Sequence, residues 1–170
     1  MLDIPHRLGI DIGKVIVDGA RNDGTDTAFF SDNFLRTTAL PGAFEVIHKL
    51  VAQFGPENVF LVSKCGPRVQ EKSLTWLAHH NFWKQTGMNT RAYRFCLRRP
   101  EKAAICKTLG ITHFIDDRAE ILVSMQGIVT HRYMFNPTDR ELQRYAEHMQ
   151  GEQVVRSWQE LEPLILNTLR

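Results

Sequence analysis

Three aspartates stand where two apolar runs of the sequence end, and their carboxylates could together bind a metal ion. Asp11 follows the run Leu8–Ile10, and Asp116 and Asp117 follow the run His113–Ile115. If both runs are strands of one parallel sheet, the carboxylates lie beyond the carboxyl ends of the strands, where such sheets bind ligands. Two carboxylates about 4 Å apart repel each other by roughly 4 kcal/mol at an effective dielectric constant of about 20. A hard cation such as Mg²⁺ relieves this repulsion, so the pattern predicts a magnesium site.

The elements that must position these aspartates are predicted by an alternation of short apolar runs with helical periodicity. This alternation is typical of strand and helix units that build a parallel sheet. The sequence therefore predicts an α/β protein with a three-layer Rossmann-like fold and a central, mainly parallel sheet. We expect six strands, at residues 8–17, 58–63, 91–97, 112–116, 127–133 and 153–156.

Helix starts are indicated by prolines suited to a first helical turn and by capping boxes, in which a side chain accepts from a free amide of the first turn. These signals predict helices that begin near Pro41, Pro100, Thr138 and Ser157. The last helix has an apolar face, so we expect the C-terminal segment to be part of the core. That face consists of Leu161, Leu164, Ile165 and Leu169.

Residues 18–40 interrupt every regular period with glycines, aspartates and threonines. A loop of this length within a compact domain is usually functional. Because it follows the first predicted strand directly, we expect it to form a flap or small cap insertion beside the carboxylates. Nothing in the sequence indicates a large cap domain or a linker, so we expect residues 1–170 to form a single domain.

The composition excludes several classes of protein. The chain has 170 residues, of which 43% are hydrophobic and 24% charged, as in an ordinary globular domain. No apolar stretch approaches the length of about 20 residues that a bilayer requires, and the N-terminus does not resemble a signal peptide. We therefore expect a cytoplasmic protein with no membrane partner. The three cysteines have no metal-binding or disulfide spacing.

The charge distribution indicates at most a local anion site. A net charge of +2 is too small to predict a polyanionic partner. Basic residues are nevertheless concentrated in residues 91–102, so the end of a nucleic acid is one candidate ligand. Arg98 and Arg99 either bind a substrate anion or form an exposed charged turn. Arg68, near the start of a further helix, is another candidate for contact with an anion.

Four motifs, taken in order, resemble those of the haloacid dehalogenase-like (HAD) hydrolase superfamily over nearly the whole chain. Residues 8–17 resemble the first motif, whose leading aspartate corresponds to Asp11. Residues 59–63 resemble the second motif, an apolar strand that ends in a hydroxyl residue, here Ser63. Lys102 matches the lysine of the third motif, with Lys107 as the alternative. Residues 114–117 resemble the fourth, metal-binding motif.

The resemblance implies a Mg²⁺-dependent phosphohydrolase that acts on a phosphate monoester. Asp11 would attack phosphorus and form an aspartyl-phosphate, which splits hydrolysis into two easier steps. The cofactor implied is Mg²⁺, and its expected ligands are Asp11, the Gly13 carbonyl, Asp116 and Asp117, the last one directly or through water. The phosphate oxygens would be held by Ser63, Lys64 and Lys102. Asp18 and Glu120 are candidates for an outer shell of the site.

Gly13 departs from the pattern of the phosphatases in this superfamily, which usually have a second aspartate two residues after the nucleophile. That carboxyl group is the general acid, and such a group typically contributes about 10²- to 10⁴-fold to the rate. Some relatives with a glycine at this position resemble sugar-phosphate phosphatases, so hydrolysis with another proton donor is one interpretation. Candidate donors are Lys14, Asp23 and Asp26. The alternative is a catalytically weak or inactive module that binds phosphate or another protein.

Residues 8–13 also resemble the first phosphate loop of a different class of enzyme, the actin-like sugar kinases. Those proteins need two such domains around a nucleotide, and 170 residues with one copy of the motif do not supply both. For the hydrolase, a small phosphorylated substrate is the expected partner, with nucleic acid and phosphoprotein as alternatives. A site without a large cap also allows closure by a second subunit, so a homo-oligomer is a further possibility.

Overall fold

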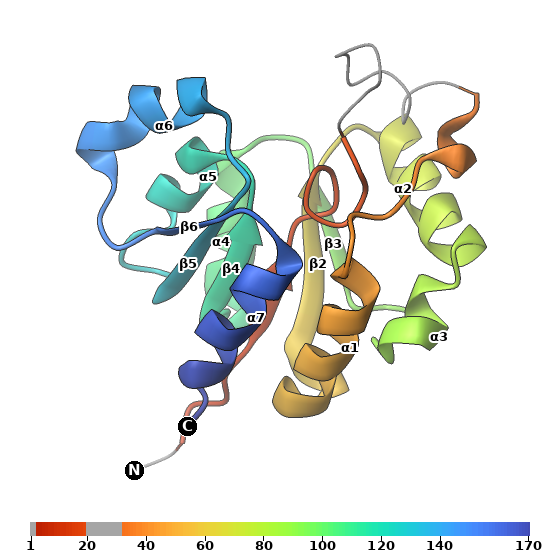
Figure 1. Ribbon diagram of the computed structural model, residues 1–170, viewed down its shortest axis with the longest axis horizontal. Helices are drawn as coiled ribbons and strands as arrows, with labels where there is room; N and C mark the ends of the chain where they lie inside the picture. The colour runs from red at the N-terminus through yellow and green to blue at the C-terminus, as the bar shows by residue number, and fades with distance from the viewer. Residues whose placement is uncertain (1–2, 20–31) are drawn as a thin grey trace.

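The computed structural model describes residues 3–19 and 32–170. In this part of the chain six parallel strands form one sheet in the order β3-β2-β1-β4-β5-β6 (Figure 1). The strands are β1 (Leu8–Ile10), β2 (Val59–Lys64), β3 (Tyr93–Cys96), β4 (His113–Asp116), β5 (His131–Phe135) and β6 (Gln153–Val155). The α-helices are α1 (Ala43–Phe54), α2 (Pro67–His79), α3 (Phe82–Thr86), α4 (Pro100–Leu109), α5 (Ala119–Ser124), α6 (Asp139–Tyr145) and α7 (Trp158–Asn167). Short 3₁₀ turns cover Phe34–Arg36, Pro56–Asn58 and Ala146–His148.

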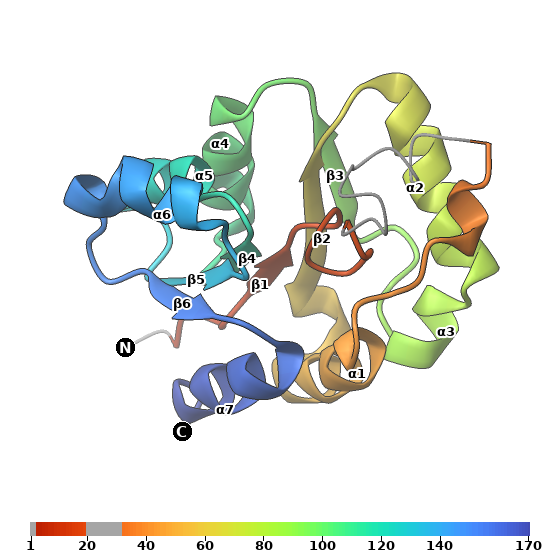
Figure 2. The same cartoon turned by 45° about the horizontal axis from the view of Figure 1, so that its top comes forward.

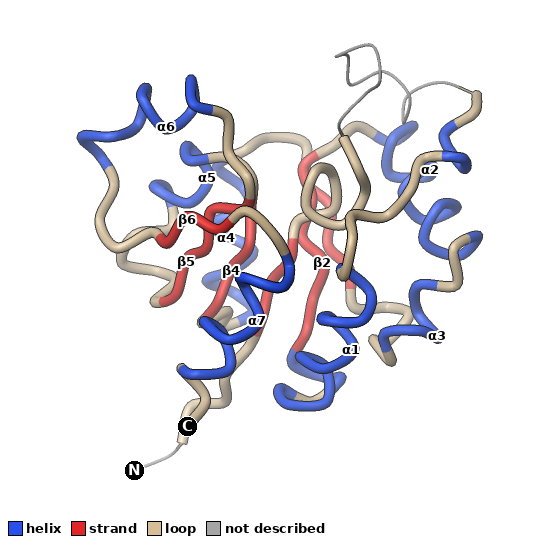
Figure 3. The backbone as a smooth tube through the Cα atoms, in the orientation of Figure 1, coloured by secondary structure: helices blue, strands red, loops and turns tan. Residues whose placement is uncertain are grey.

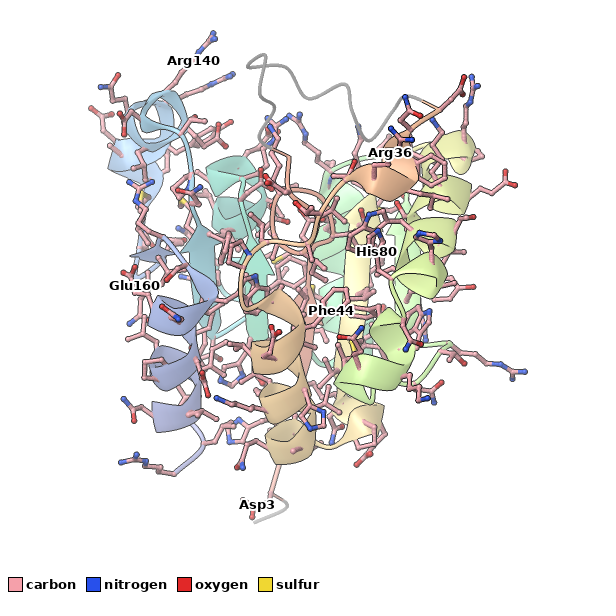
Figure 4. All side chains as sticks on the ribbon, turned by 45° about the vertical axis from the view of Figure 1, so that its right-hand side comes forward. Asp3, Arg36, Phe44, His80, Arg140 and Glu160 are labelled. Carbon is pink, nitrogen blue, oxygen red and sulfur yellow. The ribbon has the colours of Figure 1, made fainter. Side chains whose placement is uncertain are left out.

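The sheet is buried on both faces, which gives three layers. Successive side chains of a strand alternate between the faces, so Leu61 packs into one core and Val62 into the other. Helices α1, α3 and α7 contribute to the core on the first face, and α4 and α5 to the core on the second (Figure 2). On the first face lies Phe44 of α1, which is labelled in Figure 4. Its ring meets that of Phe82 edge-on, with centroids 5.1 Å apart. The predicted three-layer Rossmann-like α/β fold is confirmed.

The order of the strands creates a crevice at one end of β1. The chain begins in the middle of the sheet, adds β2 and β3 on one side, and then crosses over to add β4 on the other side. The connections after β1 and β4 therefore leave in opposite directions, and ligands bind at such a switch point. Figure 3 shows the loops that follow β1, β2 and β4 together at this end of the sheet.

The first strand is shorter than predicted. It ends at Ile10 rather than near residue 17, because the chain coils into a tight turn in which the amides of Ile16 and Val17 both donate to the Ile12 carbonyl, at 2.9 and 3.1 Å. Lys14, with a φ of 63°, has the left-handed conformation that closes this turn. Residues 15–17 are buried all the same. These residues are therefore apolar because they are buried, and not because they form a strand.

Two other boundaries were also wrong. The strand expected at residues 127–133 is β5, which runs from His131 to Phe135. Gly127, with a φ of 79°, forms a turn in which the amide of Val129 donates to the Met125 carbonyl, so the strand starts later. Pro41 was expected in a first helical turn, but α1 begins at Ala43, because Gly42 caps the helix with a φ of 80°.

The other helix starts are confirmed. Pro100 is the first residue of α4. Thr138 and Ser157 cap α6 and α7, and each accepts a hydrogen bond at 3.1 Å from the amide three residues later. Leu161 and Ile165 of α7 are buried, while Leu164 and Leu169 are partly buried against the same core. Among the described residues, no helix is both long and apolar enough to cross a membrane.

The two ends of the segment predicted to be a flap are joined by backbone hydrogen bonds. The amide of Asp18 donates to the Thr38 carbonyl at 2.9 Å, and that of Leu40 donates to the Ile16 carbonyl at 2.8 Å. These bonds fix both ends of the segment beside the turn that follows β1. The flap itself stays a prediction, because residues 20–31 lie outside the described residues.

Gly9 in the middle of β1 allows a close approach by a neighbouring side chain. A Cβ atom at this position would lie 2.5 Å from Cδ2 of Phe114, a fully buried ring on β4. We expect Gly9→Ala to lower the free energy of unfolding by about 1–3 kcal/mol, the usual cost of overpacking a core. Urea unfolding would measure the loss. Gly13→Ala is the matched control, since a Cβ atom at Gly13 meets no described atom within 4 Å; equal stabilities for the two variants would contradict the prediction.

Candidate active site

Lys102 joins Asp11 and Asp116 at the centre of the crevice. Its Nζ atom lies 3.0 Å from Oδ1 of Asp11 and 2.8 Å from Oδ2 of Asp116. The two aspartates follow from the sheet, because Asp11 comes directly after β1 and Asp116 ends β4. Lys102 is the third residue of α4 and belongs to the buried side of that helix. The structure thus brings together three of the residues singled out from the sequence, and all three are buried.

Asp117 completes a group of three carboxylates. Asp11, Asp116 and Asp117 each offer an oxygen atom, and these oxygens all lie within 4.8 Å of one another. Oδ1 of Asp116 accepts the backbone amide of Arg118 at 3.0 Å, which fixes the orientation of that carboxylate. Clustered carboxylate oxygens are the donors that Mg²⁺ prefers, so the residues present fit the predicted ion.

The pKa values of the carboxyl groups Asp11 and Asp117 are raised mainly by burial. Burial raises the pKa of Asp11 to about 6, although nearby Lys102 opposes the shift. Burial, together with the charge of Asp116, raises the pKa of Asp117 well above its ordinary value. Burial alone would lower the pKa of Lys102, but its two carboxylate partners outweigh burial and raise it. Lys102 is therefore a fixed cation, and further positive charge beside Asp11 and Asp117 would lower the pKa values of these two carboxyl groups.

The second edge of the site is formed by the end of β2. Ser63 is buried and Lys64 is exposed, and both line the cavity above Asp11. Gln70 of α2 secures the following loop, because its side-chain amide donates to the Cys65 carbonyl at 2.9 Å. Cys65 also lines the cavity, but burial raises the pKa of its thiol, so it is not an activated nucleophile.

Gly13 lies at the open side of the site, in the turn after β1. A Cβ atom at Gly13 would meet no described atom within 4 Å, and the φ angle of Gly13 is not in the left-handed region. Neither space nor backbone conformation therefore requires a glycine here. The absence of a side chain at this position leaves room in the cavity.

The cavity that contains these residues has a volume of about 390 Å³. This volume is suited to a small ligand. Its wall includes apolar side chains, and four basic residues other than Lys102 also line it. The apolar residues are Ile12, Val17, Val69 and Ile121, and the basic residues are Lys14, Lys64, Arg99 and Arg118.

Several residues considered from the sequence have other positions. Arg99 lines the cavity, but its Nη1 atom pairs with Oε2 of Glu120 at 2.7 Å, and Arg98 pairs with Glu101 on the surface. Asp18 lines the cavity. Lys107 and Arg68 are exposed and do not line it, and Asp23 and Asp26 lie outside the described residues.

Arg118 is a lining residue that the sequence analysis missed. It follows directly after Asp116 and Asp117, just before α5, and its side chain is exposed at the cavity. Its position in the sequence could have indicated this, because Arg118 directly follows the fourth motif. A residue at this position belongs to the same loop as Asp117 and therefore lies near the carboxylates. No apolar or helical periodicity marks such a position.

Comparisons with known proteins give matches to solved structures. Neither a protein-family model nor a curated protein sequence matches the chain. Among solved structures, D,D-heptose 1,7-bisphosphate phosphatase from B. bronchiseptica, in complex with magnesium and phosphate, matches with a TM-score of 0.64 at 16% identity, over 95% of this chain and 99% of the other. The corresponding phosphatase from Burkholderia thailandensis matches with a TM-score of 0.61 at 12% identity, over 95% and 98% of the two chains.

A third solved structure extends the match to nearly the complete length of both chains. It is a haloacid dehalogenase-like hydrolase, described as putative, from Burkholderia xenovorans, with a TM-score of 0.64 at 13% identity over 98% of this chain and 100% of the other. At such low identity the similarity establishes the fold and leaves the chemistry to the residues. Together with the parallel six-stranded sheet, these matches show that the chain has the haloacid dehalogenase-like hydrolase fold.

Proposed function

We propose that the chain is a Mg²⁺-dependent phosphohydrolase that acts on small phosphate monoesters through Asp11. The observation that carries the proposal is the buried group of Asp11, Lys102 and Asp116 at the switch point of the sheet, open to a cavity of about 390 Å³. The fold of the phosphatases that match the chain supports it, as does the magnesium and phosphate complex of one of them.

In the proposed reaction an Asp11 carboxylate oxygen attacks phosphorus while the bond from phosphorus to the leaving oxygen breaks. Water then attacks the phosphorus of the aspartyl-phosphate, which releases inorganic phosphate and restores the carboxylate. Lys102 holds Asp11 in place through the bond at 3.0 Å and adds positive charge beside the phosphoryl oxygens. Ser63 and Lys64 line the same cavity and would hold the remaining phosphate oxygens.

Asp11, Asp116 and Asp117, with the Gly13 carbonyl, would hold the metal. Mg²⁺ bound there would supply positive charge to offset the three carboxylates and the phosphate group of the substrate. The experiment that tests the proposal is phosphate release from an aryl phosphate with Mg²⁺ or with a chelator. We expect turnover with Mg²⁺ and its loss with the chelator. Absence of turnover on aryl phosphates and on a panel of monoesters would favour the alternative, a phosphate-binding module.

The proposal predicts a gain of activity for Gly13→Asp. The turn has room for the new side chain, and its carboxyl group would supply a general acid at the position where phosphatases of this superfamily usually have one. A general acid typically contributes about 10²- to 10⁴-fold, mostly for poor leaving groups. We therefore expect faster turnover of alkyl phosphates such as glycerol 3-phosphate, with little change for an aryl phosphate.

Gly13→Asn is the matched control for this gain, because it adds a side chain of the same shape without the acid. Phosphate release would be measured for both variants on both substrates. Equal rates of the two variants on the alkyl phosphate would contradict a missing acid as the reason for slow turnover.

A further inference from the structure

Gly13 lines the same cavity as two basic residues, Lys64 at the end of β2 and Arg118 in the loop after β4. Ile10, the last residue of β1, is in register with Leu61 on β2 and with Ile115 on β4. Gly13 lies in the turn after β1, Lys64 is the last residue of β2, and Arg118 comes two residues after the end of β4. All three line the cavity. Strand spacing is about 4.8 Å, so β2 and β4 lie roughly 10 Å apart with β1 between them, and two long side chains can span that gap.

The positive charges of Lys64 and Arg118 are not balanced within the described part of the chain. Among residues 3–19 and 32–170, neither side chain has an ion pair or a hydrogen bond, and both are exposed. Two other cations of the cavity differ in this respect. Lys102 binds two aspartates, and Arg99 binds Glu120. Lys64 and Arg118 thus present positive charge to whatever enters the cavity.

The room above Gly13 is suited to an anion. An aspartate at this position would fit, because its Cβ atom would meet no described atom within 4 Å, and its carboxylate would enter the cavity that Lys64 and Arg118 also line. The glycine leaves this space to the ligand. In the proposed function Lys102 and the metal would hold the phosphoryl group beside Asp11, so an anion near Gly13 would be a second group of the same ligand.

We propose that the substrate is a small phosphate monoester with a second anionic group, a carboxylate or another phosphate, which Lys64 and Arg118 bind above Gly13. This inference rests on the proposed function and specifies its substrate class. It also gives the missing aspartate a physical reason, since a carboxylate at position 13 would repel the second anion of the substrate.

The test compares matched substrates that differ in the second charge. The pairs are 3-phosphoglycerate with glycerol 3-phosphate, and fructose 1,6-bisphosphate with fructose 6-phosphate. We expect the KM of the doubly anionic member to be lower by about tenfold or more, since a charge-assisted hydrogen bond contributes roughly 1.5–3 kcal/mol. The pair with the larger ratio of KM values shows whether the second anionic group is a carboxylate or a phosphate. Equal KM values within both pairs would overturn the inference.

Variants of the two cations assign the effect. Arg118→Met should raise the KM of the preferred doubly anionic substrate by about tenfold and leave that of its singly anionic partner nearly unchanged. Lys64→Met should raise the KM of both substrates, because Lys64 would also hold phosphoryl oxygens, but that of the doubly anionic one by more. Arg68→Met is the control, because Arg68 is exposed but lies outside the cavity. Gly13→Asp should move the two substrates of a pair in opposite directions, with a gain for glycerol 3-phosphate and a loss for 3-phosphoglycerate. An equal effect of Arg68→Met would assign the preference to overall charge and overturn the inference.

Binding separates this inference from the proposed hydrolysis. If the protein turns over no substrate, the same pairs can be titrated by calorimetry in the presence of Mg²⁺. A preference for the doubly anionic compounds that Arg118→Met abolishes would support the site even though the proposed hydrolysis had failed. Equal affinities within each pair would overturn the site, whether or not the protein hydrolyses aryl phosphates.

Discussion

Replacement of Asp11 by asparagine abolishes phosphate release, with an expected loss of roughly 10⁴-fold or more in kcat, as for removal of a catalytic nucleophile. The amide keeps the shape of the side chain but removes the negative charge and the attacking oxygen. Burial already raises the pKa of Asp11 to about 6, so a neutral group at this position is well tolerated. We therefore expect the variant to stay folded, with Asp116 as the remaining partner of Lys102 at 2.8 Å.

Two measurements make this result specific to the nucleophile. The thermal midpoint of Asp11→Asn should stay close to that of the wild type, which excludes unfolding as the cause of the loss. Asp18→Asn removes another carboxylate that lines the same cavity, and we expect its kcat to fall by less than about tenfold, since general electrostatic effects at a half-exposed position are small. Turnover by Asp11→Asn at the wild-type rate would exclude Asp11 as the nucleophile.

A covalent intermediate gives an independent check. Rapid acid quench of the wild type with a labelled aryl phosphate should leave label on the protein, because an acyl phosphate survives acid better than base. Asp11→Asn should retain none. Label on both proteins would place the phosphoryl group on another residue.

The strand ends could be predicted from the sequence because a buried parallel strand is a continuous apolar run. Asp11, Ser63 and Asp116 each stand at the end of such a run, and the structure places all three around one cavity. The position of Lys102 could be predicted as well. Pro100 indicated the start of α4. Lys102, the third residue of this helix, therefore lies near the sheet edge, and Lys107 lies further along the helix.

The turn after β1 could not be predicted, because a run of apolar residues indicates burial but does not distinguish a strand from a buried turn. Residues 15–17 are as buried as a strand, yet they belong to a coil that is closed by hydrogen bonds to the Ile12 carbonyl. Arg118 was missed for a different reason. Arg118 shares a cavity with Lys64 because β2 and β4 both pair with β1, and no local sequence pattern contains this pairing.

Replacement of Lys102 by methionine should destabilise the metal-free protein by about 3–5 kcal/mol, the usual result of removing one partner from a buried ion pair. Lys102 is only 3% exposed, and it is the cation that both Asp11 and Asp116 contact, at 3.0 and 2.8 Å. Methionine fills a similar volume, so the loss reports mainly the charge. Urea unfolding at pH 7 with a chelator present would measure it, and Lys107→Met, an exposed change on the same helix, is the control.

The loss should shrink as the pH falls. Without Lys102 the pKa of Asp11, already raised to about 6 by burial, rises further, because an attractive charge is gone. A carboxyl group whose pKa is higher in the folded than in the unfolded protein binds its proton more tightly when folded, so acid favours the folded form. We therefore expect a smaller difference between variant and wild type at pH 5 than at pH 7. An equal difference at both pH values would show that lost packing, and not charge, destabilises the variant.

Mg²⁺ should restore much of the stability that Lys102→Met loses. Without the lysine, three carboxylates whose oxygens lie within 4.8 Å of one another have no cation among them, so their affinity for a divalent ion should increase. An ion at a hundredfold excess over its Kd adds about 2.7 kcal/mol to stability. The increase in the free energy of unfolding on addition of Mg²⁺ should thus be larger for Lys102→Met than for the wild type. If Mg²⁺ binds at these carboxylates, it shares its ligands with the ammonium group of Lys102, so loss of the lysine must change its affinity. An equal increase in both proteins would therefore show that the ion binds elsewhere.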